Sequence, residues 1–222
     1  MAIHNIEVYK RFERLWHWSQ MALIMTLLVT GFAVHGVHSL IEFELAVTIH
    51  TVAALAMIAI WTFAVFWLIT TGEWRQYIPR VTNISAIARY YIQGIFKGEH
   101  HPYIKTYRRK HNPLQALTYL LVKVIIFPAV WITGIAYLLI SFGIGGDFFA
   151  GVGLSFIADL HTVAAFAILA FVCVHVYLLT TGDHGFFAHV KPMVTGVDEV
   201  ELTEEEYAYL KADEPNRVRD IK

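Results

Sequence analysis

The chain has 222 residues, of which 57% are hydrophobic and 16% charged, and its mean hydropathy is +0.52. Soluble domains carry about a quarter of their residues as charged side chains, so this composition favours an integral membrane protein. The net charge of −1 gives no sign of a nucleic-acid partner, and the single cysteine excludes an internal disulfide, a paired-cysteine metal site and a covalently attached haem.

The N-terminal residues MAIHNIEVYKRFERLW have no apolar core followed by a cleavage site, so we expect no cleaved signal peptide. Four later segments are apolar enough to cross a bilayer, which needs about 20 residues of helix. The third should begin near Pro113, because proline suits the first position of a helix. The predicted spans cover residues of about 12–36, 46–71, 114–142 and 157–182.

Basic residues indicate how these spans are oriented. Three lie in residues 1–14, eight in 73–113 and five after 182, whereas the connections at 36–46 and 143–159 contain none. Lys and Arg are retained on the cytoplasmic side during insertion. We therefore predict an all-α, integral membrane four-helix bundle with up-down-up-down topology and both termini in the cytoplasm.

Two halves of the chain resemble each other. The sequence HTVAA begins at His50 and again at His161, and a Thr-Gly pair occurs in LLVTGF (27–32) and in VWITGIAY (130–137). Shared apolar composition is the simpler explanation, but the recurrence at corresponding ends of the second and fourth spans favours an internal repeat.

The segments outside the spans carry fewer signals. Residues 84–96 have apolar positions at helical spacing, so this segment is expected to lie along the cytoplasmic interface. We divide the chain into a membrane domain, 1–192, and an acidic cytoplasmic tail, 193–222. In the tail, Thr203 and Glu206 predict the capping box of a short helix.

Histidines within the spans are the candidate functional residues. His161 and His175 lie fourteen residues apart, which corresponds to about 21 Å of helix and nearly the same face. Ionisable side chains inside a membrane are functional candidates, although a single histidine can also simply join two helices through a hydrogen bond.

Two further histidines lie at matching depths on other spans. The depths pair His17 with His175 near the cytoplasmic side and His50 with His161 near the outer side. Two layers of paired imidazoles predict two b-type haems with axial histidine ligands. His35 is an alternative to His50, since it lies eighteen residues from His17 and shares its helix face.

Other residues near these layers have less specific roles. Arg11 and Arg14 are candidates for ion pairs with haem propionates, or for snorkelling to the interface. Gly31 and Gly134 either let a macrocycle approach the backbone or allow close helix packing.

The chain resembles one family in four features: its four spans, LWHW near the start, the histidine that opens the second span and the two histidines of the fourth. It is the family of di-haem cytochrome b membrane subunits of respiratory formate dehydrogenases, nickel–iron hydrogenases and thiosulfate reductases. The resemblance covers about residues 8–192. It implies that His50 and His161 bind an outer haem, and His17 and His175 an inner one.

The resemblance also implies a quinone site on the cytoplasmic side. RRKHNPLQ (108–115) is similar to the family's K-Y-N-x-x-Q stretch, which implies quinone contacts for His111, Asn112 and Gln115. His111 stands where the family has tyrosine, and Asn112 could also cap the following helix. Lys123, inside the third span, is expected to meet a propionate or to snorkel.

The expected function is electron transfer across the bacterial inner membrane, through two b-type haems, between a periplasmic iron–sulphur or other redox subunit and quinone. The chain would be a non-catalytic subunit, and a partner catalytic subunit would act on the primary substrate. Three alternatives remain: a transition-metal transporter or channel that uses the histidines, an anchor without cofactor, and a cytochrome that works without a dedicated partner.

Overall fold

The computed structural model describes residues 2–79, 82–99, 102–103, 110–145, 153–180 and 185–219, with the backbone alone at 185, 186, 188 and 189. Parts of the segments discussed above therefore lie outside the described residues, namely Arg108, Arg109, residues 146–152 and the predicted end of the fourth span at 181–182.

Among the described residues, four helical segments are long and apolar enough to cross a membrane. Two are the continuous helices α1 (Arg11–Val34) and α2 (Phe43–Thr71), and a third is α7 (Leu154–Thr180). The remaining one joins α4 (Pro113–Leu121), the π-helical turn η4 (Val122–Ile126) and α5 (Phe127–Ser141). These helices confirm that the described residues contain four candidate membrane spans, and α4 confirms the helix start at Pro113.

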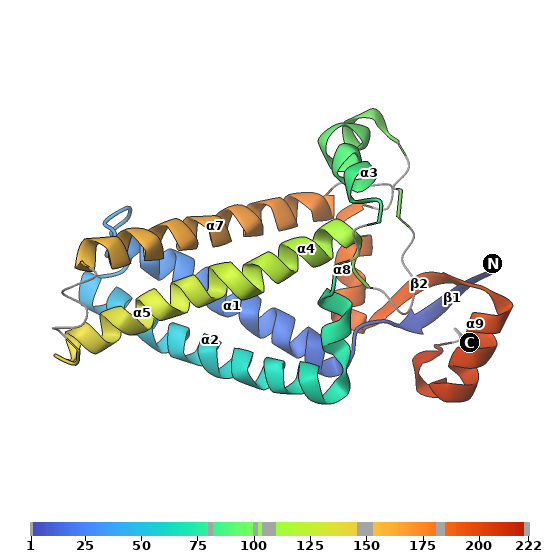
Figure 1. Ribbon diagram of the computed structural model, residues 1–222, viewed down its shortest axis with the longest axis horizontal. Helices are drawn as coiled ribbons and strands as arrows, with labels where there is room; N and C mark the ends of the chain where they lie inside the picture. Colours follow the sequence, from blue (N-terminus) through green and yellow to red (C-terminus); the bar gives the residue numbers. More distant parts are fainter. Residues whose placement is uncertain are drawn as a thin grey trace. The chain divides into compact units, whose positions relative to one another are not determined.

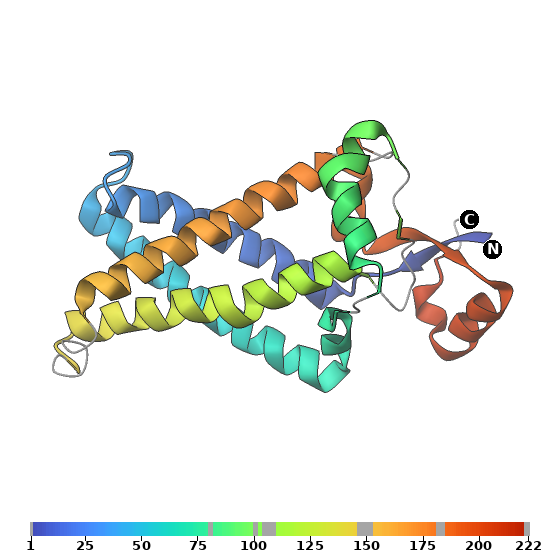
Figure 2. The same ribbon diagram turned by 45° about the horizontal axis from the view of Figure 1, so that its top comes forward.

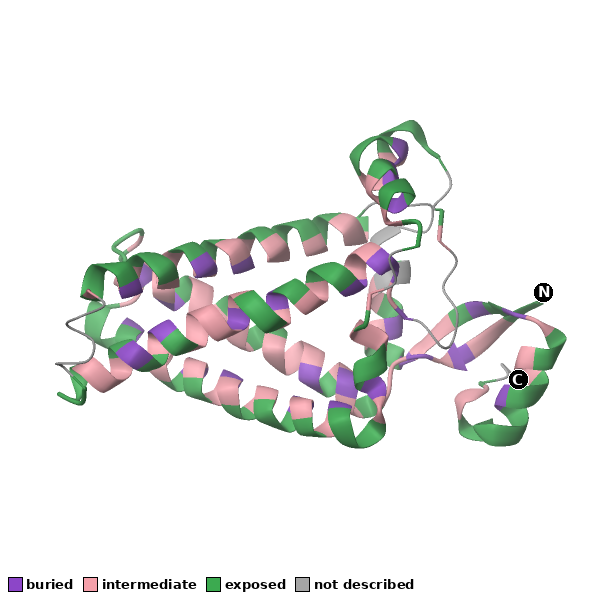
Figure 3. Ribbon diagram, in the orientation of Figure 1, coloured by how far each residue is buried: buried purple, intermediate pink, exposed green. Residues whose placement is uncertain are grey.

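Helices suit these sequences because lipid offers the backbone no hydrogen-bond partners, so each segment must satisfy its own N–H and C=O groups. Only 11% to 22% of the most apolar stretch of each span is buried within the protein. Figure 3 accordingly shows mainly exposed and intermediate residues along α2, α5 and α7. These faces are suited to contact with lipid.

The π-helical turn has a local cause. Pro128 has no N–H to donate to the carbonyl of Val124, and its ring crowds the preceding turn, so the helix widens at Val122–Ile126. Lys123 lies within this widened turn.

The described chain divides into two compact units, and the long helices contribute to both. One unit, here called the helical unit, comprises Ser19–Trp67 and Leu120–His175. Its parts of α1, α2, α5 and α7 run beside one another in both Figure 1 and Figure 2. Val122, Phe127 and Ile168 form a buried cluster in it, against which Trp61, Trp131 and Phe171 also pack.

The other unit, here called the terminal unit, comprises Met1–Trp18, Leu68–Tyr119 and Val176–Lys222. It contains a two-stranded antiparallel sheet, in which β1 (Ala2–Glu7) pairs with β2 (Val197–Leu202) so that Ala2 faces Leu202. Ile6, Val8, Val200, Leu202 and Leu210 form its buried core. The fold is therefore mainly helical rather than all-α, which corrects the prediction.

The sheet changes the interpretation of the acidic tail. Val200 and Leu202 are buried and alternate with exposed Glu199 and Glu201, which is the pattern of a strand with one packed face. The tail strand pairs with the first residues of the chain, across the boundary placed at residue 192. The predicted capping box of Thr203 and Glu206 is confirmed at the start of α9 (Glu204–Asp213).

Shorter helices complete the terminal unit. α3 (Ile84–Arg89), the π-helical η2 (Tyr90–Gly94) and η3 (Ile95–Lys97) confirm that residues 84–96 are helical. The remaining short elements are η1 (Glu73–Tyr77), α8 (Gly185–Thr195) and η5 (Pro215–Arg217).

Candidate functional site

Two of the candidate histidines meet inside the helical unit. His50 of α2 and His161 of α7 have ring centroids 6.3 Å apart, with an angle of 62° between the ring planes. His35, the alternative to His50, follows the end of α1 and is exposed. The structure therefore brings together the two residues that open the repeated HTVAA sequences.

Each of these histidines bonds to a buried threonine. The Nδ1 atom of His50 is 2.9 Å from the hydroxyl of Thr30, and the Nδ1 atom of His161 is 2.9 Å from the hydroxyl of Thr133. Thr30 and Thr133 belong to the two Thr-Gly pairs noted in the sequence. The repeat in sequence is thus also a repeat of one local structure.

The glycines of these pairs lie beside the same rings. A Cβ atom at Gly31 would lie 3.5 Å from Cε1 of His50, and one at Gly134 would lie 3.4 Å from Cε1 of His161. The absence of a side chain therefore leaves the edge of each imidazole next to bare helix backbone. This placement fits both interpretations of the glycines, close helix packing and the approach of a bulky planar group.

The spacing of the two rings fits a shared metal ion. An imidazole nitrogen lies about 2 Å from a bound transition-metal ion and the ring centroid about 1.2 Å farther, so two opposed ligands place centroids about 6.4 Å apart. The observed 6.3 Å is close to this value. His50 and His161 are therefore spaced as two imidazoles that would hold one haem iron between them.

The other two candidate ligands lie in different units. His17, near the start of α1, meets Trp18 edge to face with ring centroids 5.1 Å apart. His175, near the end of α7, stacks on Phe171 at 5.9 Å. Since His17 belongs to the terminal unit and His175 to the helical unit, their pairing stays a prediction.

Of the basic residues predicted to pair with haem propionates, Arg11 is exposed and Arg14 is half-buried. The guanidinium of Arg14 donates a hydrogen bond to the carbonyl of Val194 in α8. Lys123 is half-buried in the π-helical turn, and its ammonium nitrogen is buried. All three roles stay predictions.

The predicted quinone residues lie together at the start of α4. The Oδ1 atom of Asn112 accepts a hydrogen bond from the backbone N–H of Gln115 at 2.8 Å. The Oε1 atom of Gln115 accepts one from the backbone N–H of Asn112 at 3.1 Å. This reciprocal pattern is a capping box. The Nδ2 group of Asn112 also donates to the Tyr91 hydroxyl at 3.0 Å. The expected capping role of Asn112 is therefore confirmed.

His111 is placed between two aromatic rings and beside a cavity. Its ring centroid lies 5.4 Å from that of Tyr77 and 5.0 Å from that of Tyr119. Burial raises the pKa of the Tyr77 hydroxyl, and the carboxylates of Glu13 and Glu73 raise it further. A cavity of about 130 Å³ adjoins the site, lined by Gln76, Ile78, Thr82, Asn83, Tyr103, His111, Pro113 and Ala116.

A buried ionic cluster next to His111 was missed by the sequence reasoning. The ammonium group of Lys110 donates to both carboxylate oxygens of Glu13, at 2.7 and 2.8 Å, and to Glu73 at 3.3 Å. Burial tends to raise the pKa of Glu73, but Lys110 and Lys10 outweigh this and lower it below its usual value. No local sequence pattern signals this cluster, because its members lie far apart in the chain.

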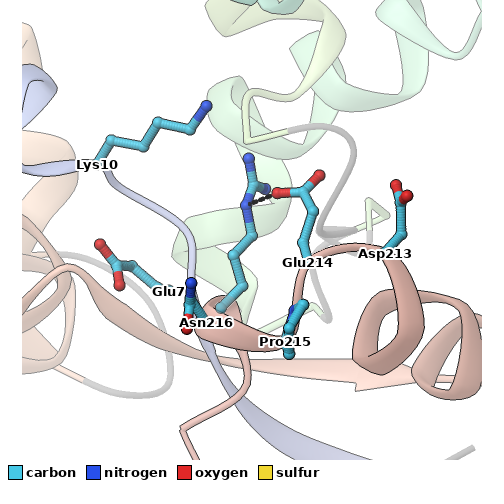
Figure 4. Close-up of a pocket in the computed structure, with 7 residues that line it drawn as sticks. Glu7, Lys10, Asp213, Glu214, Pro215 and Asn216 are labelled. Atoms are coloured by element: carbon cyan, nitrogen blue, oxygen red, sulfur yellow. Dashed lines mark ion pairs between the residues drawn. The ribbon is translucent and has the colours of Figure 1, made fainter.

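The C-terminal tail reaches the same cluster. Arg217 lies 3.8 Å from Glu73 and also pairs with Glu214. A charged surface pocket of about 360 Å³ is lined by Arg217 and its neighbours. Figure 4 shows Glu7 and Lys10 from the N-terminal segment and Asp213–Asn216 from the tail around it. These contacts connect both ends of the chain to Glu73.

Comparison with known proteins supports the same interpretation. Residues 8–196 match the family described as prokaryotic cytochrome b561. The chain is also 32% identical over 202 residues to "Putative cytochrome YdhU" of Escherichia coli (strain K12), covering 86% of this chain and 74% of that protein. No solved structure matches significantly.

The match covers all four spans and all four candidate histidines, and it confirms the predicted cytochrome b family. Such a protein binds b-type haem and transfers electrons. With its four apolar helices, this chain is a multi-pass protein of the bacterial inner membrane. The chain belongs to the prokaryotic cytochrome b561 family.

Proposed function

We propose that the chain is the cytochrome b subunit of a respiratory complex and passes electrons, through two b-type haems, between a periplasmic redox subunit and membrane quinone. The observation that carries this proposal is the pair formed by His50 and His161, whose rings are spaced as two imidazole ligands of one metal ion would be. The matched threonine bonds of the two histidines support it.

The outer haem would be held by His50 and His161. When bound, it supplies an iron that alternates between the ferrous and ferric states. The protein residues orient the imidazoles, exclude water and surround the site with apolar side chains, which together influence the redox potential. Gly31 and Gly134 leave room for the group at the edges of the two rings.

The inner haem would be held by His17 and His175. Support comes from their matching depths in the sequence and from the fourteen-residue spacing that puts His175 on the same face of α7 as His161. The stacking of Phe171 on His175 restricts the orientation of that imidazole. Arg11, Arg14 and Lys123 are the basic residues available for propionates.

The proposed topology is up-down-up-down, with both termini and residues 73–113 in the cytoplasm. The distribution of Lys and Arg supports it, because the connections at 36–46 and 143–159 contain none. The pairing of β1 with β2 supports it as well, since it requires the two ends of the chain to lie on the same side of the membrane.

Quinone would bind near His111 and exchange electrons with the inner haem. The capping box occupies the side chains of Asn112 and Gln115, so His111, which lines the cavity, is the better candidate for a direct contact with a quinone carbonyl. Reduction of a quinone takes up two protons with its two electrons. A site on the cytoplasmic side would take them from the cytoplasm.

The periplasmic partner would be an iron–sulphur or other redox subunit with its own catalytic subunit. The short length of the two predicted outer connections supports docking of a separate protein there.

A haem count on the purified chain tests the proposal. A pyridine haemochrome assay with a reduced-minus-oxidised spectrum should give about two b-type haems per chain. His50→Ala and His161→Ala should each remove one and the same haem, and His17→Ala and His175→Ala the other. His38→Ala is the matched control, since His38 donates to the Val29 carbonyl at 2.9 Å and is expected to retain both haems.

Two results would contradict the proposal. A wild-type chain that contains no haem when produced in a haem-replete host would remove the electron-transfer function. Retention of both haems by His50→Ala or His161→Ala would show that other residues bind the outer haem.

A further inference from the structure

We propose that Thr30 and Thr133 are positioning residues that hold His50 and His161 in the tautomer needed for iron ligation and lower the redox potential of the outer haem. This inference rests on the proposed outer haem site. The threonine hydroxyls would orient the two histidines, while the Thr-Gly pairs also allow close packing.

The hydrogen-bond pattern determines where each proton lies. A threonine hydroxyl has one proton to donate. The Thr30 hydroxyl lies 2.7 Å from the carbonyl of Thr26, and the Thr133 hydroxyl lies 2.6 Å from the carbonyl of Ala129. A carbonyl can only accept, so each hydroxyl donates its proton to its own helix. It must then accept a bond from the histidine.

The consequence for the imidazole follows directly. Nδ1 carries the proton that it donates to threonine, and Nε2 of the neutral ring therefore keeps its lone pair. A metal ion binds an imidazole through such a lone pair. Each threonine thus helps to prepare one histidine for ligation, together with a helix carbonyl that hydrogen-bonds the same ring, that of Leu27 for His50 and that of Val130 for His161.

Burial makes this arrangement persistent. Thr30 is 1% exposed and Thr133 is 4% exposed, so water has little access to compete for either hydroxyl. In surroundings of low polarity a hydrogen bond is stronger than in water, and successive bonds polarise one another. The histidine, the hydroxyl and the helix carbonyl form such a sequence in both halves of the unit.

Ordinary threonines in these helices provide a comparison. Thr62 in α2 also donates to the carbonyl four residues earlier, at 2.9 Å, but it is exposed. A hydrogen bond from a threonine hydroxyl to the carbonyl four residues earlier is common in helices, and it does not depend on a nearby histidine. The bond to a histidine is the additional feature of Thr30 and Thr133, and it occurs twice with the same 2.9 Å distance.

The expected effect is on the redox potential. A partner that accepts a bond from the outer nitrogen of a ligating histidine raises the basicity of that ligand. A more basic ligand stabilises ferric over ferrous iron. Loss of the acceptor should therefore raise the midpoint potential of the outer haem and leave that of the inner haem unchanged.

The test uses Thr30→Val and Thr133→Val in the full, haem-loaded chain, because valine keeps the shape of threonine and removes the hydroxyl. Thr30→Ser and Thr133→Ser should restore the bond, and Thr62→Val is the matched control. The readouts are haem content, a redox titration of both haems and the low-spin ferric EPR signals. We expect each valine variant to favour the ferrous state about tenfold more, which is about 59 mV for a one-electron couple.

The outcomes separate this inference from the proposed function. Loss of the outer haem in a valine variant, with retention in the serine variant, would also support the role of the hydroxyl. Unchanged potentials and EPR signals in both valine variants would overturn it, while the haem counts of the histidine variants would still support the proposed function. Equal changes in the valine and serine variants would also overturn it, because they would indicate a packing effect.

Discussion

The buried ionic cluster makes a sharp test of the packing of the terminal unit. Lys110 has a side chain that is 2% exposed, and its ammonium group contacts Glu13 and Glu73, whose side chains are 11% and 9% exposed. The substitution Lys110→Met removes the charge and keeps most of the length of the side chain. It leaves two buried carboxylates that have lost their shared cation.

The size of the effect follows from this burial. Removing one partner of a buried ion pair typically costs about 3–5 kcal/mol, because the remaining charge has lost both its solvent and its partner. Lys10 still contacts Glu73 at 2.9 Å, and its backbone N–H still donates to Glu13 at 2.8 Å, so both carboxylates keep some compensation. We therefore expect a loss near the lower limit, about 3 kcal/mol.

Reversible unfolding in mixed detergent micelles, followed by tryptophan fluorescence, measures this change. The matched control is Arg219→Met, which breaks an ion pair with Glu7 whose arginine side chain is 55% exposed. That variant should lose less than about 1 kcal/mol, since exposed ion pairs contribute little. Equal stability losses in the two variants would refute the argument that burial makes the Lys110 cluster important.

Three further predictions concern the same unit. The pKa of Glu73 is lowered in the folded protein, so its ion pairs stabilise the fold above its ordinary pKa of 4.5 and lose this effect as the pH falls below it. Acid unfolding curves should show a smaller pH dependence in Glu73→Gln, and an unchanged dependence would contradict this. Asn112→Ala should cost about 1 kcal/mol of stability through the lost cap, whereas Leu117→Ala at an exposed position of the same helix should cost less. Leu202→Ala should cost about 2–5 kcal/mol, because the side chain is 1% exposed, and should make the tail more sensitive to limited proteolysis than Glu201→Ala does. Identical digestion of these two variants would argue against a folded tail.

The helices, their limits and several caps follow from the sequence because they depend on residues close together in the chain. Uninterrupted apolar stretches predict the spans, Pro113 predicts a helix start, and Thr203 with Glu206 predicts a capping box. The helix start and the capping box are decided within about four residues, the range of helix hydrogen bonds, and a span by a continuous apolar stretch of about 20 residues. The pairing of His50 with His161 was predicted from the matching depths of the two residues in their spans, and the repeated HTVAA segments favoured His50 over His35.

Contacts between distant residues required the tertiary structure. Glu13, Glu73 and Lys110 meet only after the chain has folded, and the pairing of β1 with β2 joins residues as far apart in the chain as Ala2 and Leu202. The sequence predicts that Gly31 and Gly134 lie near the histidine layers. Only the tertiary structure shows that the hydroxyls of Thr30 and Thr133 bond to His50 and His161. The chain's local pattern thus determined which segments become membrane helices and which histidines lie inside them. The packing of helix against helix decided which imidazoles and hydroxyls meet, because side-chain contacts across a bundle depend on the rotation and spacing of each helix, and these are set jointly by all the surfaces in contact.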